Sequence, residues 1–80
     1  MVMGDRAVYR LSQDDALELM RIHPRAGRRW FHGGVEFPAI VVAVFGPGQA
    51  ALQVFVGPGI LFKSCAWMGE TTGTFSLQTL

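Results

Sequence analysis

Residues 37 to 62, FPAIVVAVFGPGQAALQVFVGPGILF, carry no charge and decide the fold of this chain. Two Gly-Pro-Gly turns, at residues 46–48 and 57–59, divide this stretch into short segments rich in Val, Ile and Phe. Such segments between turn signals are typical of β-strands. A membrane-spanning helix is not expected, because it needs about 20 uninterrupted apolar residues.

Working outward, we expect strands at residues 39–45, 51–56, 60–68 and 74–79, which form a β-meander over residues 37–80. In residues 51–56, Leu52, Val54 and Val56 alternate with Gln53 and Phe55, so the two sets lie on opposite faces. The same alternation predicts that Ile60, Phe62, Ser64, Ala66 and Met68 face away from Leu61, Lys63, Cys65 and Trp67. A short strand or an extended arm is expected at residues 7–11.

One helix is expected at about residues 13–22. Ser12 suits the N-cap position, where its hydroxyl accepts from the backbone N–H of Asp15. Pro24 stops the helix, and residues 23–36 form a long basic connection. The predicted fold class is therefore α+β: one domain over residues 1–80, with a short N-terminal helix packed on a mostly antiparallel, strongly twisted sheet of four to five strands.

The middle strands are apolar on both faces, and strands of that kind are normally covered on both. A ten-residue helix covers only one face, so we expect a homo-oligomer, a dimer or a tetramer, in which another subunit covers the second face. The alternative is a tightly curled barrel that covers itself.

Composition excludes several classes. The net charge is +1, so no global basic field favours duplex DNA. The N-terminus lacks a basic end followed by an apolar run, so no export signal is expected. We therefore expect a cytoplasmic location. A sole cysteine, Cys65, sits mid-strand, and two histidines lack metal-ligand spacing. We therefore expect no catalytic residues, no metal and no cofactor.

The strongest functional signal is a basic cluster at the end of the helix, comprising Arg21, His23, Arg25, Arg28 and Arg29 and followed directly by Trp30, Phe31 and His32. Arginine binds phosphate through two parallel hydrogen bonds, and aromatic rings stack on bases. The cluster therefore favours a nucleotide or a single-stranded segment as ligand. Its alternative interpretation is a solvated loop that keeps the protein soluble.

The order of motifs along the chain resembles a family of small phage-encoded proteins similar to anti-CBASS cyclic-dinucleotide sponge proteins. The resemblance rests on Tyr9-x-Leu11-Ser12-x-x-Asp15-Ala16-x-x-Leu19, Phe37-Pro38-Ala39-Ile40-Val41-Val42-x-Val44-Phe45-Gly46, Leu52-Gln53-Val54-Phe55-Val56 and Gly69-Glu70-x-x-Gly73-Thr74-Phe75. It implies an oligomer, in an infected bacterial host, that sequesters a cyclic dinucleotide signal without cleaving it. Of the helix-end arginines of that family only Arg21 is kept, and its acidic loop is replaced by residues 57–59.

The ligand contacts expected for such a protein fall into two groups. Cationic groups for the phosphates come from Arg21, His23, Arg25 and Arg28, while stacking or hydrogen-bonding groups for the bases come from Tyr9, Trp30, Gln53, Ser64, Trp67 and Thr74. Tyr9 is equally suited to the core, and Trp67 to a subunit interface. The competing hypotheses are a phage protein-interaction module without a small ligand, such as a host-enzyme inhibitor or assembly factor, and a single-stranded nucleic-acid binder.

Overall fold

The computed structural model describes residues 1–25, 30–57 and 59–78. The order of elements is β1 (Arg6–Arg10), α1 (Gln13–Ile22), β2 (Glu36–Gly46), β3 (Gln49–Phe55), β4 (Ile60–Met68) and β5 (Thr74–Leu77). The chain is therefore α+β, with one short helix and a mostly antiparallel sheet, as the sequence predicts. Strand β2 begins before the expected residue 39 and includes Pro38. Residue 79, the expected end of the last strand, lies outside the described residues.

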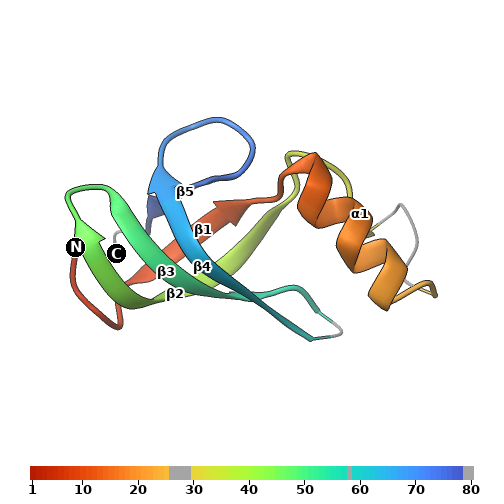
Figure 1. Cartoon of the computed structure of the whole chain (residues 1–80), viewed down its shortest axis with the longest axis horizontal. Coiled ribbons are helices and arrows are strands. Elements are labelled where there is room, and N and C mark those ends of the chain that lie inside the picture. Colours follow the sequence, from red (N-terminus) through yellow and green to blue (C-terminus); the bar gives the residue numbers. More distant parts are fainter. Residues whose placement is uncertain (26–29, 58, 79–80) are drawn as a thin grey trace.

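The sheet closes into a barrel in the order β1-β2-β3-β4-β5. Strands β1 to β4 pair as antiparallel neighbours, and β5 returns to pair antiparallel with β1 and parallel with β4. Figure 1 shows β5 crossing back to β1 after a wide loop. The expected β-meander is thus wrong for the last strand, and the barrel that was the alternative is the observed architecture.

The barrel interior is the hydrophobic core. Tyr9, Leu11, Val41, Leu52 and Phe75 are almost completely buried there. A small barrel of this kind is filled by side chains and holds no interior channel. In β3 the predicted alternation is confirmed, because Leu52 and Val54 are buried while Gln53 and Phe55 are exposed.

The alternation predicted for β4 is wrong beyond Lys63. Lys63 pairs with Leu52 and Ala66 pairs with Ala50, so β4 holds one extra residue at this point. Ser64 and Cys65 are both exposed, and Ala66 turns into the core. Similar register shifts occur in β2, between Val41 and Ala43 and between Val44 and Gly46. Such bulges bend strands and redirect side chains, which here helps the short strands to curl into a barrel.

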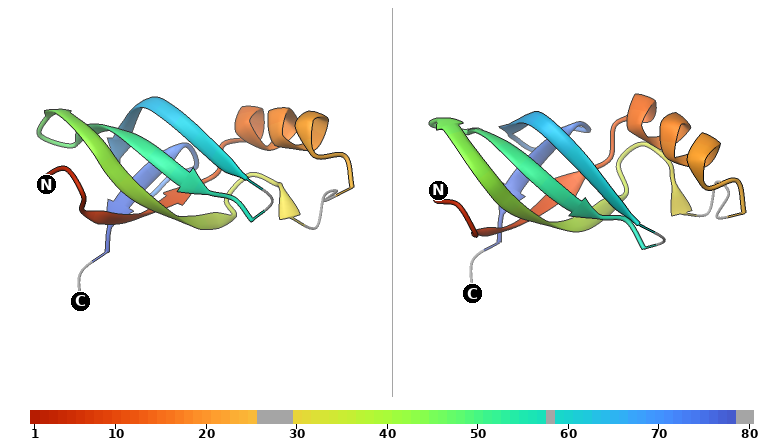
Figure 2. Two further views of the ribbon diagram at one scale, coloured as in Figure 1. Left: turned by 90° about the horizontal axis from the view of Figure 1, so that it is seen from below. Right: turned by 60° about the horizontal axis from the view of Figure 1, so that its bottom comes forward.

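Helix α1 lies beyond one end of the barrel and not over a sheet face (Figures 1 and 2). It has the range that the sequence predicts, and the Ser12 hydroxyl accepts from the Asp15 backbone N–H at 3.1 Å. Ala16 and Leu19 are its buried residues, and they join the core together with Phe31. The helix therefore caps the end of the barrel.

Barrel closure covers the inner face of the strands but leaves the outer face open. Large apolar side chains remain exposed on β2, β3 and β4: Val44, Phe45, Phe55, Ile60, Phe62, Trp67 and Met68. These side chains make up the second apolar face that the sequence pattern indicates for the middle strands. The outer surface, and not the barrel interior, is consequently where a partner or ligand has to be sought.

Candidate functional site

One row of side chains crosses the outer face of four neighbouring strands. Arg6 pairs with Ile40, Ile40 pairs with Gln53, and Gln53 pairs with Phe62. Residues directly opposite in antiparallel strands project from the same face. The backbone N–H of Gln78 donates to the Arg6 carbonyl at 2.9 Å, which extends the row past β1. These strand pairings thus align one guanidinium, two carboxamides and two apolar groups.

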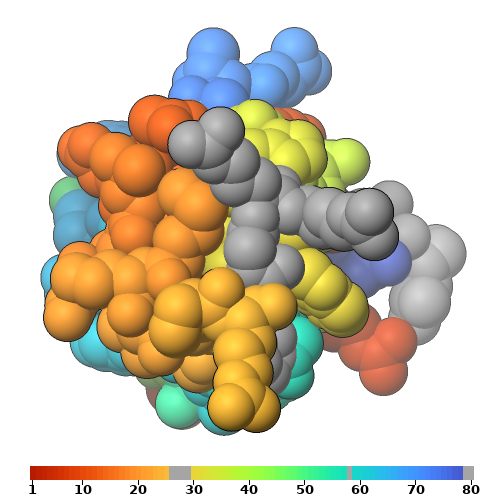
Figure 3. Space-filling view, turned by 90° about the vertical axis from the view of Figure 1, so that its right-hand side faces the viewer, coloured from red at the N-terminus to blue at the C-terminus, as the bar shows by residue number. Residues whose placement is uncertain are grey.

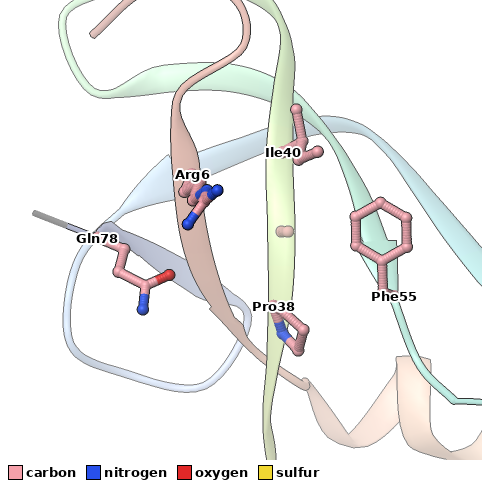
Figure 4. Close-up of a pocket in the computed structure, with 6 residues that line it drawn as sticks. Arg6, Pro38, Ile40, Phe55 and Gln78 are labelled. Carbon is pink, nitrogen blue, oxygen red and sulfur yellow. The ribbon is translucent and has the colours of Figure 1, made fainter. Parts of the chain in front are cut away.

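A pocket of about 280 Å³ lies along this row. Its lining residues come from β1, β2, β3 and the segment after β5: Arg6, Pro38, Ala39, Ile40, Phe55 and Gln78. Figure 4 shows the polar ends of Arg6 and Gln78 on one side of the pocket and the Phe55 ring on the other, with Pro38 and Ile40 between them. We call this pocket, together with the adjoining Gln53, the outer groove.

Charge in the outer groove comes from a single side chain. Arg6 is exposed, and no ion pair or side-chain hydrogen bond joins its guanidinium to another residue of the described ranges. The rest of the lining is apolar or amide-bearing. An unengaged guanidinium beside an apolar wall suits an anionic ligand that also carries a flat apolar surface.

Arg21, His23 and Arg25, three of the residues predicted to bind phosphate, lie elsewhere, at the α1 end of the molecule, which faces the reader in Figure 3. Arg21 is exposed and its guanidinium hydrogen-bonds to Glu18 on the same helix. This neighbouring cation lowers the pKa of Glu18, and the carboxylate raises the pKa of Arg21. Arg25 is exposed, while Arg28 lies outside the described residues.

His23 and Trp30 at this end contact the turn between β3 and β4. A methyl group built on Gly57 would come within 3.0 Å of the Trp30 ring, and one on Gly59 would come within 3.6 Å of His23 Nε2. The His23 ring also lies 6.2 Å from the Phe31 ring, centroid to centroid. Trp30 keeps about half of its surface exposed. His23 and Trp30 of the predicted cluster therefore pack against the β3–β4 turn of the barrel.

Tyr9 lies in the core, where 1% of its surface is accessible. Its hydroxyl donates to the Asp15 carboxylate, and Lys63 Nζ donates to the other oxygen of that carboxylate at 3.0 Å. Burial, the hydrogen bond and the charge of Asp15 raise the pKa of Tyr9 far above its usual value. Burial alone would raise the pKa of Asp15, but the hydrogen bonds from Tyr9 and Lys63 and the Lys63 charge hold it below its usual value.

The remaining predicted contacts occupy two further places. Gln53 and Ser64 are exposed on β3 and β4, and only Gln53 adjoins the outer groove. Trp67 and Thr74 form a parallel pair between β4 and β5, and the Thr74 hydroxyl donates to the Thr71 carbonyl. The nine predicted residues that the structure describes are thus not brought together in one pocket.

Sequence reasoning missed Arg6, Pro38, Ile40, Phe55 and Gln78 as site residues. The alternation in β3 already placed Phe55 on the same face as Gln53, and this signal could have identified it. Arg6 and Gln78 join the groove only through the β1–β2 register and the return of β5 to β1. Both pairings are long-range, so no local pattern indicates them.

No family model, curated protein or solved structure matches this chain in the comparisons with known proteins. The described residues contain no group of three or more His, Cys, Asp or Glu side chains that could hold a metal ion. Within the same residues no helix is long and apolar enough to cross a membrane. The outer groove therefore has to be interpreted from its own chemistry.

Proposed function

We propose that this protein is a non-enzymatic sponge that binds a cyclic nucleotide signal in the outer groove and holds it intact. The observation that carries the proposal is the alignment of Arg6, Gln53 and Gln78 beside Phe55 and Ile40 on one surface. The motif resemblance to phage sponge proteins supports the same ligand class. A nucleotide signal offers a counterpart for each kind of group in the groove.

In this proposal the Arg6 guanidinium binds the phosphate. It presents parallel N–H donors that match two phosphate oxygens. Because no described carboxylate occupies it, a phosphate would not have to displace an existing partner. Its exposed position makes that attraction dependent on salt concentration.

In this proposal the apolar wall and the carboxamides bind the base. Phe55 is 37% exposed, so part of its ring is accessible for stacking. Stacking of a base on an aromatic ring contributes about 1–3 kcal/mol. Carboxamides such as those of Gln53 and Gln78 pair with the donor and acceptor edge of a purine.

The volume of the groove sets the portion of ligand that it encloses. Small-molecule pockets have volumes of roughly 300–1,000 Å³, and the volume of this pocket, about 280 Å³, is just below that range. Under this proposal the pocket holds one base with its adjoining phosphate. The other half of a cyclic dinucleotide would extend over Gln53 toward Phe62, its neighbour in the row.

Isothermal titration with a panel of purine cyclic dinucleotides tests the proposal. We expect saturable binding, with affinity reduced tenfold or more by Arg6→Gln and by Phe55→Ser. Trp67→Ser is the matched control, because Trp67 is also an exposed aromatic side chain but does not line the groove. Chromatography of the denatured complex should recover uncleaved ligand. Absence of binding to every member of the panel would refute the proposal, and recovery of cleaved ligand would refute the sponge mechanism.

A protein-interaction module is the second candidate, and one observation favours it. Ile60 and Phe62 are about 60% exposed and continue the apolar surface beyond the groove, on the β4 side. A protein partner would cover both the groove and this extension, and aromatic side chains are common anchors of such interfaces. Under this function Phe62→Ser would abolish partner binding, and no cyclic dinucleotide would bind to the isolated protein.

A further inference from the structure

Strand β4 is paired on both sides over only part of its length. Strand β5 pairs with it at Trp67 and Met68, and Figure 1 shows β5 beside the end of β4 that lies away from α1. Over residues Ile60–Ser64 no strand of the described ranges pairs with the side of β4 opposite β3. Leu61 and Lys63, which face inward here, are accordingly only half-buried, whereas their partners in β3 are fully buried.

The register of the β3–β4 hairpin shows which backbone groups face this open side. The Val56 N–H donates to the Gly59 carbonyl at 3.1 Å, so these two residues form a hydrogen-bonded pair. In an antiparallel ladder such pairs alternate with pairs whose N–H and C=O groups point away from the partner strand. Along the ladder from Gly59, the N–H and C=O groups of Ile60 and Phe62 therefore point away from β3. No backbone hydrogen bond among the described residues uses these four groups.

This open side of β4, which we call the β4 edge, lacks the usual protection. Proteins guard exposed strand edges with prolines, with charged side chains or with a covering element. Residues 60–64 include no proline, and their one charged side chain, Lys63, is bound to Asp15 at 3.0 Å. The β4 edge thus presents N–H donors and C=O acceptors in the alternation of a strand. Another peptide backbone matches that alternation, whereas the backbone of a nucleic acid offers acceptors alone.

The charges beside the β4 edge indicate which peptide it suits. The C-terminal end of α1 lies next to the start of the edge, because a methyl group built on Gly59 would come within 3.6 Å of His23 Nε2. Residues 23–35 contain three arginines and no acidic residue, and of these arginines Arg25 is described and exposed. The acidic residues of α1 either bind a cation of the chain or lie in its first turn, at the other end. Acidic side chains in the partner would complement this positive end.

We propose that the β4 edge binds an extended segment of a partner protein as an added antiparallel strand whose C-terminal end is acidic. Strand addition satisfies the free backbone groups of Ile60 and Phe62. Antiparallel pairing is the more stable arrangement, and it places the C-terminal end of the segment beside His23 and Arg25. No residue of β4 lines the pocket of the outer groove, so the inference does not depend on the proposed ligand.

Fluorescence anisotropy of the full chain with labelled octapeptides tests the inference. The probe, Thr-Val-Thr-Val-Thr-Glu-Asp-Glu, combines strand-forming residues with an acidic end, and we expect it to bind saturably. A copy that is N-methylated over its first five residues lacks the backbone donors, and a copy that ends in Lys-Arg-Lys reverses the charge. Each change should lower the affinity by about tenfold or more.

Two variants at Phe62 separate the backbone contact from the side chain. F62P removes an outward N–H and leaves the ladder to β3 intact, because proline is tolerated where the N–H of a strand faces solvent. It should abolish binding of the acidic probe. The matched variant F62T keeps the N–H and removes the ring, so it should bind as the wild type does. R25E should weaken binding of the acidic probe and strengthen binding of the basic copy.

Several outcomes would overturn the inference. These are no binding of the acidic probe at millimolar concentration, equal binding of the N-methylated copy, an F62T variant that loses as much affinity as F62P, or a wild-type dimer that F62P alone dissociates, which would mean that the edge pairs with a second copy. Thermal unfolding by circular dichroism establishes that each variant is folded. If F62P is unfolded, I60P at the first residue of β4 provides the same test.

Discussion

Lys63 Nζ lies 3.0 Å from Asp15 Oδ1 and 5.9 Å from the centre of the Tyr9 ring. These three residues come from β4, α1 and β1, so the contact joins the helix to two strands of the barrel. Among the described residues Lys63 is the only side chain of β4 that forms an ion pair. Lys63, the only charged residue of β3 and β4, thus links the helix to the barrel.

We predict that Lys63→Met destabilises the protein by about 1–3 kcal/mol, because it leaves the partly buried Asp15 carboxylate without its cation. Urea unfolding provides the measurement. The double variant with Asp15→Asn should lose less than the sum of the two single variants, since both changes remove the same contact. Strictly additive losses would show that the ion pair contributes nothing.

The stability that Asp15 supplies should be lost in acid. Its pKa is lowered in the folded state, so its contribution is complete above the unfolded value of about 3.9 and falls as the pH drops through the folded value. We expect the difference in unfolding free energy between the wild type and Asp15→Asn to be constant from pH 7 to about pH 5. It should shrink below about pH 4, and a difference independent of pH would contradict this assignment.

Tyr9 should titrate far above pH 10. It is the only tyrosine, so tyrosinate absorbance reports on it alone. Because its folded pKa is raised, the stability it contributes is complete below about pH 10 and is lost as the pH rises further. The absorbance change should coincide with alkaline unfolding in the native protein and follow an ordinary titration in urea. Titration near pH 10 with the fold intact would place Tyr9 at the surface.

Gly57→Ala should destabilise the protein for two reasons, backbone strain and the contact with the Trp30 ring. A control variant separates the two. Gly57 has a φ of +90° and faces the Trp30 ring, whereas Gly4 has a φ of +95° and nothing within 4 Å of the added methyl group. Gly4→Ala therefore measures the backbone strain alone, about 1 kcal/mol. Urea unfolding should give a larger loss for Gly57→Ala. Equal losses would show that the Trp30 contact does not constrain this turn.

Local patterns predicted much of the secondary structure. The hydroxyl of Ser12 and the position of Pro24 indicate both ends of α1, and the Gly-Pro-Gly segments mark the turns around β3. These signals act within a few residues, so the sequence displays them directly. The strand β5 shows the limit of such signals, because pairing of Phe75 with Tyr9 brings together opposite ends of the chain.

The candidate site was less predictable than the fold. The cluster from Arg21 to Trp30 is conspicuous because its residues are adjacent in sequence, yet Arg21 pairs with Glu18 and Trp30 contacts the β3–β4 turn. The outer groove as a whole has no local sequence signature, because Arg6 and Phe55 lie on β1 and β3, which only their pairing with β2 brings near each other. The extra residue near Ser64 likewise interrupts an alternation that the sequence presents as continuous.

Mapping the amide chemical-shift changes of the ¹⁵N-labelled protein during titration with a cyclic dinucleotide tests the central proposal most directly. The proposed sponge function predicts changes that cluster at Arg6, Ile40, Gln53, Phe55 and Gln78, and that saturate together. Changes confined to the segment from Arg21 to Trp30, or no changes at millimolar ligand, would contradict it.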